Sequence, residues 1–162
     1  MFTYKYPRPA LTADAILLSV NSDGDSVVLL VKRGNEPFKG QWAFPGGFVN
    51  EGERAIEAAR RELHEETGIL IDSLDKFIPI GLYDTPGRDP RGWTVSAAFC
   101  SCVDVMPQPA AADDADNARW FLINELPHLA FDHETILNDV IEVLANLPGD
   151  DGEGDDGGDY VL

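Results

Sequence analysis

The chain has 162 residues, 44% hydrophobic and 25% charged, a composition typical of one globular domain with a sizeable core. Asp and Glu number 29 against 12 Lys and Arg, which gives a formal net charge of -17. This acidity argues against sequence-independent binding to DNA or RNA, because such binding depends on basic surface. An anionic substrate must therefore be met by metal ions or by a few local arginines.

Residues 11–20 and 26–33 predict two strands, with Asp14 as a charged break in the first, and the turn-forming residues between them indicate a hairpin. Residues 41–44 predict a short extended piece, and Pro45-Gly46-Gly47 predicts a sharp turn. The helix expected next ends at Gly68. This helix is expected to span residues 53–67. Strands are expected at 77–82, 94–105 and 118–122, and a closing helix at 133–147.

Strands on both sides of a helix, followed by a terminal helix, indicate an α/β fold with a mixed sheet covered on two faces. We expect one domain over residues 1–147 and a solvated acidic tail over 148–162. Cys100 and Cys102 predict two reduced cysteines packed as small hydrophobes, because neither a zinc site nor a disulfide framework can be assembled around them. The chain shows neither a signal-peptide layout nor a bilayer-spanning run, so we expect a cytoplasmic protein with no membrane partner.

The helix at 53–67 concentrates negative charge, since its spacing places Glu62, Glu65 and Glu66 on one stripe. The ordinary interpretation is a solvated face of salt bridges between residues four apart. The glycines immediately upstream argue against it, because Gly46 can present a backbone carbonyl beside the carboxylates. Three carboxylates and a carbonyl make an all-oxygen site suited to Mg²⁺ or Mn²⁺.

The same segment fits the Nudix box, G-x5-E-x7-R-E-U-x-E-E-x-G-U with U aliphatic, without a departure. The matching residues are Gly47, Glu53, Arg61, Glu62, Leu63, Glu65, Glu66, Gly68 and Ile69. The fixed identities match a given start by chance with a probability on the order of 10⁻⁹. The chain thus resembles the Nudix hydrolases, and the hairpin, the Phe-Pro-Gly-Gly stretch and the closing helix fall where a Nudix α/β/α sandwich needs them.

The resemblance implies a role for each residue of the box. Glu62, Glu65 and Glu66, with the carbonyl of Gly46, would bind divalent metal, while an ion pair of Glu53 with Arg61 would orient the helix. A metal-bound water becomes a better nucleophile near neutral pH, and the cations stabilise charge on the phosphoryl oxygens. The implied substrate is a nucleoside diphosphate linked to a further group, cleaved at the pyrophosphate.

Residues outside the box must determine which of these substrates the protein binds. Arginine forks recognise phosphate and aromatic faces stack bases, so four residues of the loop at 83–93 are binding candidates: Tyr83, Arg88, Arg91 and Trp93. The alternative is a surface turn with exposed arginines. Arg33, at a strand end, is a further phosphate candidate against the alternative of a solvated strand end. This loop, with stretches near residues 6–15 and 129–137, resembles the ADP-ribose pyrophosphatase branch.

The leading hypothesis is therefore a Mg²⁺-dependent hydrolase that cuts ADP-ribose to AMP and ribose 5-phosphate. Alternatives are a nucleoside triphosphate or dinucleotide pyrophosphatase and, in another class, a non-catalytic ADP-ribose sensor. The complete box and the acidic charge disfavour the sensor. The expected partner is a small nucleotide, and a homodimer is compatible with the resemblance. The general base is left open among three acids, Asp113, Asp114 and Asp116.

Overall fold

The computed structural model describes residues 1–109 and 117–148. Within these ranges the chain forms strands, two α-helices and a short 3-10 helix at Leu74–Lys76. The strands are β1 (Ala10–Val20), β2 (Ser26–Lys32), β3 (Trp42–Ala43), β4 (Gly46–Phe48), β5 (Ile78–Tyr83), β6 (Thr94–Cys102) and β7 (Ala118–Leu122). The helices are α1 (Ala55–Thr67) and α2 (His133–Ala145).

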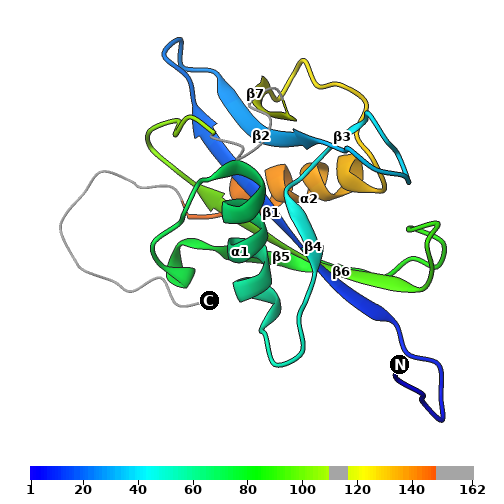
Figure 1. The fold of residues 1–162 in the computed structure, drawn as a ribbon. Coiled ribbons are helices and arrows are strands. Elements are labelled where there is room, and N and C mark those ends of the chain that lie inside the picture. Colours follow the sequence, from blue (N-terminus) through cyan, green and yellow to red (C-terminus); the bar gives the residue numbers. More distant parts are fainter. Residues whose placement is uncertain (110–116, 149–162) are drawn as a thin grey trace.

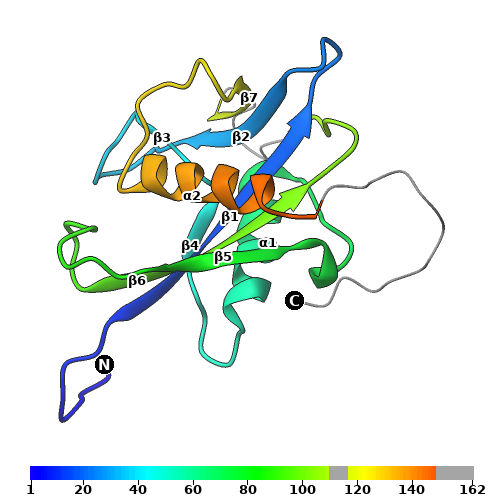
Figure 2. The same ribbon diagram turned by 180° about the vertical axis from the view of Figure 1, so that it is seen from behind.

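The strands form one mixed sheet with the main order β3-β2-β1-β6-β5, while β4 pairs with β1 and β7 with β2. β1 runs parallel to β6 and antiparallel to β2, which confirms the predicted hairpin. α1 lies in front of the sheet in Figure 1, and α2 lies in front of it when the molecule is seen from behind in Figure 2. The predicted α/β fold, with helices on two faces of a mixed sheet, is confirmed.

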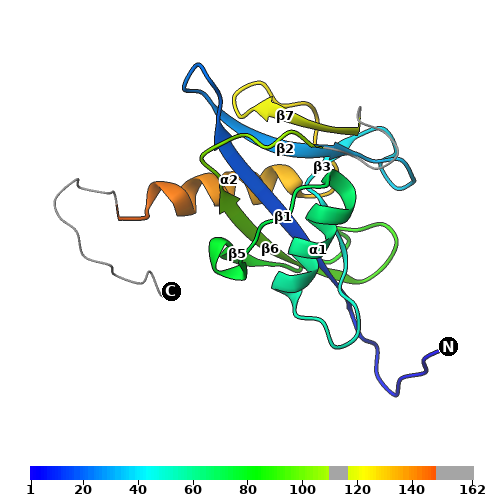
Figure 3. The same ribbon diagram turned by 60° about the vertical axis from the view of Figure 1, so that its left-hand side comes forward.

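The alternation of side chains along β1 explains why both faces of the sheet are covered. Ala13, Ala15 and Leu17 are buried in the cluster that includes α1, while Ile16 and Leu18 are buried in the cluster that includes α2. Successive residues of a strand point to opposite faces, so an almost continuous apolar run serves both layers. Figure 3 shows β1 passing between the two helices, with the N-terminal residues extending beyond its start.

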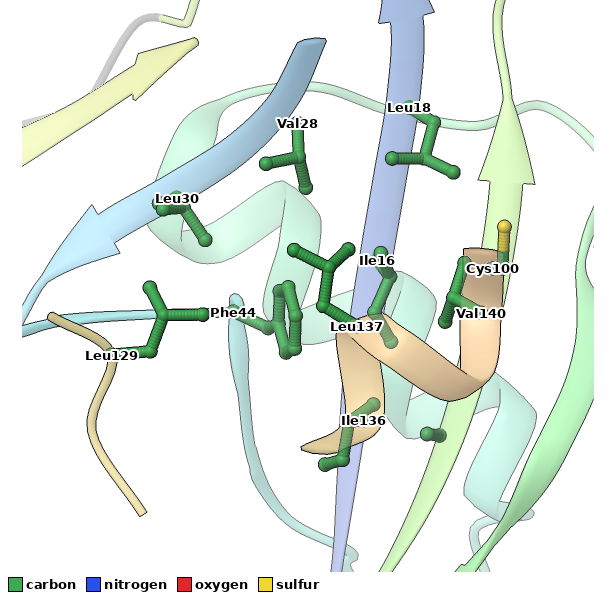
Figure 4. Close-up of a cluster of buried hydrophobic side chains, with 11 residues drawn as sticks. Ile16, Leu18, Val28, Leu30, Phe44, Cys100, Leu129, Ile136, Leu137 and Val140 are labelled. Atoms are coloured by element: carbon green, nitrogen blue, oxygen red, sulfur yellow. The ribbon is translucent and has the colours of Figure 1, made fainter. Parts of the chain in front are cut away.

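The α2 layer is held by apolar side chains at helical spacing. Ile136, Leu137 and Val140 are buried, and Figure 4 shows them facing residues of β1, β2 and β6, among them Cys100. Burying each such side chain stabilises the fold by about 1.5–3 kcal/mol. The terminal helix predicted at 133–147 is thus confirmed, although it ends at Ala145.

One predicted helix start and one predicted turn are wrong, for reasons that bear on the site. The box helix begins at Ala55 instead of Glu53, because Arg54 has extended backbone angles, φ -76° and ψ 149°, and serves as the N-cap. Gly46 and Gly47 make no sharp turn, since they belong to β4 and pair with β1 at Asp14 and Ala13. They are needed for close packing, as described below.

The prediction for the cysteines is half right. Cys100 is buried in the α2 cluster, whereas Cys102 is exposed because β6 ends there, three residues earlier than predicted. Neither helix in the described part of the chain has the length and hydropathy that crossing a membrane requires.

Candidate active site

The end of α1 presents two of the box glutamates to β4 and the third to solvent. Ala58, Ala59 and Leu63 anchor the helix in the core, and Gly68, with a φ of 74°, ends it. Around this anchor, Glu62 is 15% exposed and lies beside β4, whereas Glu65 is 56% exposed. The predicted single stripe is therefore divided between a sheltered and a solvated part.

Arg61 connects four acidic or carbonyl groups around α1. Its guanidinium donates to both carboxylate oxygens of Glu53, at 2.7 and 3.0 Å, and to Glu62 at 2.7 Å. Longer bonds of 3.2 and 3.1 Å reach Glu65 and the carbonyl of Phe48. The bonds to Glu53 and Glu62 raise the pKa of Arg61, and the Arg61 bond lowers the pKa of Glu53. The charged pair of Glu53 and Arg61 thus fixes α1 to the segment before it.

Glu66 points to β4, where its Oε2 accepts a hydrogen bond of 3.1 Å from the amide of Gly46. Burial, with the negative charges of Glu62 and Asp14, raises the pKa of Glu66 to about 8. The Gly46 bond and the charge of Arg33 oppose this shift. Carboxylates gathered in a sheltered place hold protons in this way when no cation compensates them.

The glycines of β4 allow this close approach. A Cβ on Gly47 would lie 2.6 Å from a carboxylate oxygen of Glu62, and one on Gly46 would overlap Asp14 and the carbonyl of Ala13. Gly46 meets the backbone of β1 at Ala13 and Asp14, which cannot move aside, whereas Gly47 meets the carboxylate end of the Glu62 side chain. Packing thus requires glycine at position 46, and a side chain at position 47 would displace the carboxylate of Glu62.

Asp14 is a buried acid that the sequence analysis did not select. Its Oδ2 accepts a hydrogen bond from the hydroxyl of Ser96 and lies 3.7 Å from Nε2 of His133. The Nδ1 of His133 accepts a bond of 3.1 Å from the amide of Phe44, and burial lowers the pKa of His133, which favours its neutral ring. A lone acid inside an apolar strand is the signal in the sequence, but the expected charged break is wrong, because β1 runs unbroken from Ala10 to Val20 and Asp14 is buried in it.

The predicted metal ligands are brought near one another without forming a closed cluster. Within residues 1–109 and 117–148, no group of three or more His, Cys, Asp or Glu side chains is gathered closely enough to hold an ion. Arg61 holds Glu62 and Glu65, while Glu66 accepts from Gly46. The donor set nevertheless fits a divalent cation, because it consists of hard oxygens and a cation would compensate the negative charges that raise the pKa of Glu66.

A solvent-open cavity adjoins this acidic group, and Asp14, Gly46 and Gly47 form part of its wall. Its remaining wall includes three arginines: Arg33, which follows β2, and Arg88 and Arg91, which lie in the loop between β5 and β6. The arginines predicted from the loop and from the strand end are therefore brought together. The cavity joins a cationic wall to the acidic end of α1.

The three arginines differ in what they already contact. Arg88 is 4% exposed and makes a two-pronged pair with Asp132, at 2.6 and 2.9 Å. Arg91 pairs with the buried Asp89 at 2.7 Å. Among the described residues Arg33 has no carboxylate within salt-bridge distance, and burial together with the charge of Arg91 lowers its pKa.

The other candidates lie elsewhere. Tyr83 donates a bond of 2.8 Å to Asp139 on α2, and Trp93 is 54% exposed. Neither belongs to the cavity wall. Asp132 is the N-cap residue of α2, but its carboxylate binds Arg88 and makes no capping bond. The three candidates for general base, Asp113, Asp114 and Asp116, lie outside the described residues.

The comparisons with known proteins agree with this geometry. A family model described as the NUDIX domain matches residues 10–143. The ADP-ribose pyrophosphatase of Methanocaldococcus jannaschii is 45% identical over 137 residues, which cover 83% of this chain and 74% of that enzyme.

Solved structures give the same result. The NUDIX domain of Shewanella oneidensis NrtR, complexed with ADP ribose, matches at a TM-score of 0.74 and 28% identity, covering 86% of this chain and 90% of that one. A bifunctional NMN adenylyltransferase/ADP ribose pyrophosphatase from Francisella tularensis, complexed with AMP and a manganese ion, matches at 0.72 and 30% identity. That match covers 86% of this chain and 43% of the Francisella chain. With a complete box, this fold and these relatives, the chain belongs to the Nudix family and is a pyrophosphohydrolase.

Proposed function

We propose that this enzyme hydrolyses the pyrophosphate bond of ADP-ribose, giving AMP and ribose 5-phosphate, and that it requires a divalent cation. The observation that carries the proposal is the shared wall of the cavity. Gly46 and Gly47 line the arginine-bearing cavity and also contact Glu66 and Glu62. A diphosphate bound at the arginines would therefore lie beside the carboxylates of α1. The 45% identity to an archaeal ADP-ribose pyrophosphatase supports the choice of substrate.

The cation would be held by Glu62, Glu65 and Glu66, with the carbonyl of Gly46. When bound, a divalent cation activates water and neutralises charge on phosphoryl oxygens. Burial and like charges raise the pKa of Glu66 to about 8, so this carboxyl must lose a proton before it can act as a ligand near neutral pH. Arg61 would hold the carboxylate of Glu62 beside β4. Mg²⁺ is the expected cation, and the manganese of the Francisella relative makes Mn²⁺ the first alternative.

The arginines of the cavity would divide the work of substrate binding. Arg33 has no carboxylate partner in the described residues, so we assign it the primary contact with the diphosphate. Arg91 is 41% exposed beside Asp89 and would add a second contact. Both hydrogen bonds of Arg88 go to Asp132, so we propose that Arg88 positions the loop between β5 and β6 against α2.

The proposal is tested by giving the purified full chain Mg²⁺ or Mn²⁺ and a panel of substrates. The panel comprises ADP-ribose, NADH, diadenosine polyphosphates, sugar nucleotides and nucleoside triphosphates. We expect the highest kcat/KM for ADP-ribose, with AMP and ribose 5-phosphate as products by chromatography and no turnover with a chelator. Faster turnover of a triphosphate at matched low concentration would overturn the substrate assignment and favour the triphosphate pyrophosphatase.

The sensor alternative is kept because the NrtR domain is known in complex with ADP ribose. The same assay separates the two functions. A sensor would bind ADP-ribose in a calorimeter and leave it intact after long incubation with either metal. An enzyme would consume it, and the Glu66→Gln variant would bind the substrate without consuming it.

A further inference from the structure

His133, the first residue of α2, is a buried histidine whose side chain bonds to the main chain of a distant segment. Its Nδ1 accepts the hydrogen bond of 3.1 Å from the amide of Phe44, 89 residues earlier in the chain. The two rings are stacked, with centroids 4.9 Å apart and an interplanar angle of 22°. An imidazole nitrogen that accepts a hydrogen bond carries no proton, so the ring proton lies on Nε2, which is 3.7 Å from Asp14. The function proposed above gives this histidine no role.

A second bond reinforces the contact between the start of α2 and the segment before β4. The amide of Ala130 donates to the carbonyl of Trp42 at 2.8 Å. Ala130 and His133 thus hold residues 42–44 from the α2 side, and Phe131, which lies between them in the chain, lines the cavity. The segment is therefore anchored to a helix that carries none of the proposed metal ligands.

A rigid residue connects this anchored segment to the proposed carbonyl ligand. Pro45 is fully buried, its ring fixes φ at about -65°, and its carbonyl accepts a bond of 2.8 Å from the amide of Ala15. The residue before a proline is itself restricted to extended conformations. Phe44 and Pro45 therefore leave the peptide of Gly46 little freedom to rotate.

The polar groups of Gly46 are directed at α1. The amide of Gly46 donates to Glu66, and in an antiparallel ladder the amide and carbonyl of one residue point to the same side of the strand. The carbonyl that would bind the cation is thus directed by the backbone that His133 anchors two residues earlier. Groups that orient a metal ligand without touching the metal commonly change metal affinity or activity by about 10- to 100-fold when they are replaced.

We propose that His133 is a positioning residue for the metal site, acting through its bond to Phe44 to direct the carbonyl of Gly46 at the divalent cation. The inference rests on the function proposed above, which includes the cation, and extends it to a residue of α2. Without this bond the buried amide of Phe44 has no acceptor, and the segment has to shift to find another. The carbonyl of Gly46 would shift with it, while the carboxylates stay on α1.

Two replacements separate the hydrogen bond from the ring that makes it. His133→Phe retains a ring that can stack on Phe44 and removes the acceptor. His133→Asn places an amide oxygen close to the position of Nδ1 and so retains an acceptor. Val140→Ala is the control for lost stability, because Val140 is buried on the same helix and Figure 4 shows it across the cluster from Phe44.

The test measures Mn²⁺ binding to the full chain without substrate, by calorimetry and by the electron paramagnetic resonance signal of free Mn²⁺. His133→Phe should weaken binding by about tenfold or more, while His133→Asn stays near the wild type. Val140→Ala should lower Tm without weakening binding, which is also what a purely structural role of His133 would give in His133→Phe. During turnover, His133→Phe should need correspondingly more metal for its half-maximal rate, with KM for ADP-ribose at saturating metal near the wild-type value.

Three results would overturn the inference: wild-type Mn²⁺ affinity in His133→Phe, an equal loss in His133→Asn, or an equal loss in Val140→Ala. If His133→Phe does not fold, amide hydrogen exchange in the wild type replaces it. Coupling between two sites is reciprocal, so Mg²⁺ should slow exchange of the Phe44 amide more than that of the Val140 amide. Equal slowing of the two amides counts against the inference.

Failure of the proposed function is distinguishable, because metal binding is measured without turnover. A chain that binds Mn²⁺ in a manner dependent on His133 and does not cleave ADP-ribose would keep the inference and lose the substrate assignment. A wild type that binds no divalent cation would lose both.

Discussion

The amide of Gly46 donates a hydrogen bond of 3.1 Å to the carboxylate of Glu66, and this bond ties β4 to the last turn of α1. The contact places a sheltered carboxyl next to a backbone that cannot carry a side chain. It also places Glu66 near Glu62 and Asp14, whose charges add to the effect of burial on its pKa. If Glu66 is a metal ligand as proposed, stability, metal binding and activity are linked at this one carboxyl.

Stability without metal should fall as the pH rises. The pKa of Glu66 is raised from 4.5 to about 8 in the fold, so between these values the folded chain holds a proton that the unfolded chain has lost. The free energy of unfolding then decreases by up to about 1.4 kcal/mol per pH unit. Denaturant unfolding in chelator from pH 5 to 9 measures this slope. Glu66→Gln should flatten it, and an identical slope in that variant would show that other groups cause it.

Divalent metal should stabilise the protein most at high pH. A cation binds the ionised form of Glu66, so adding Mg²⁺ or Mn²⁺ at pH 8.5 should raise Tm by several degrees. The increase should shrink toward pH 6, where protons compete, and in Glu66→Gln at either pH. NaCl at the same ionic strength controls for screening by salt. A Tm that ignores all divalent ions would contradict the proposed ligand set.

Arg61→Lys should lower kcat by at least tenfold. Arg61 makes five hydrogen bonds, two of them to the carboxylate of Glu53, and the single ammonium of lysine cannot reproduce this fork. Glu62 would lose the partner that holds it beside β4. Arg60→Lys, one position away on the same helix, is the control and should retain activity. The measurement is kcat at saturating Mg²⁺. Equal values in Arg61→Lys and Arg60→Lys would contradict the proposal that Arg61 orients the glutamates.

Gly47→Ala should reduce turnover more than it reduces stability. The added Cβ would lie 2.6 Å from the carboxylate of Glu62, so that side chain has to move. Gly81→Ala is the matched control, since a Cβ there meets nothing within 4 Å and its φ is not in the left-handed region. Tm and kcat are measured for both. Wild-type kcat in Gly47→Ala would mean that the position of Glu62 does not matter to the reaction.

Arg33→Ala and Arg88→Ala should fail in different ways. Removing Arg33 should raise KM for ADP-ribose by about tenfold or more and leave Tm near the wild-type value, because a charge-assisted hydrogen bond to substrate is lost. Removing Arg88 leaves Asp132 without its partner and should cost about 3 kcal/mol of stability. Urea unfolding and steady-state kinetics separate the two. The assignments are reversed if Arg88→Ala is stable and has a raised KM.

The sequence by itself determined the features that depend on neighbours along the chain. The box, the helix with its Gly68 stop, the first hairpin and the terminal helix follow from local spacing and turn residues, and the structure contains all of them. Apolar runs predicted the strands, and residues at helical spacing predicted the helices. The order of these elements along the chain predicted the mixed sheet. The family follows from the box, because its fixed identities are too many to occur together by chance.

Only the tertiary structure decided which residues of distant segments meet. Asp14 meets Ser96 and His133 across separations of 82 residues and more, and Arg88 meets Asp132 across 44. The division of the glutamates into sheltered and exposed was also invisible in the sequence, because helical spacing gives a direction but not what lies there. Phe131 reached the cavity wall through contacts of its neighbours with Trp42 and Phe44. Local patterns set the elements, whereas burial and charge depend on how the sheet brings those elements together.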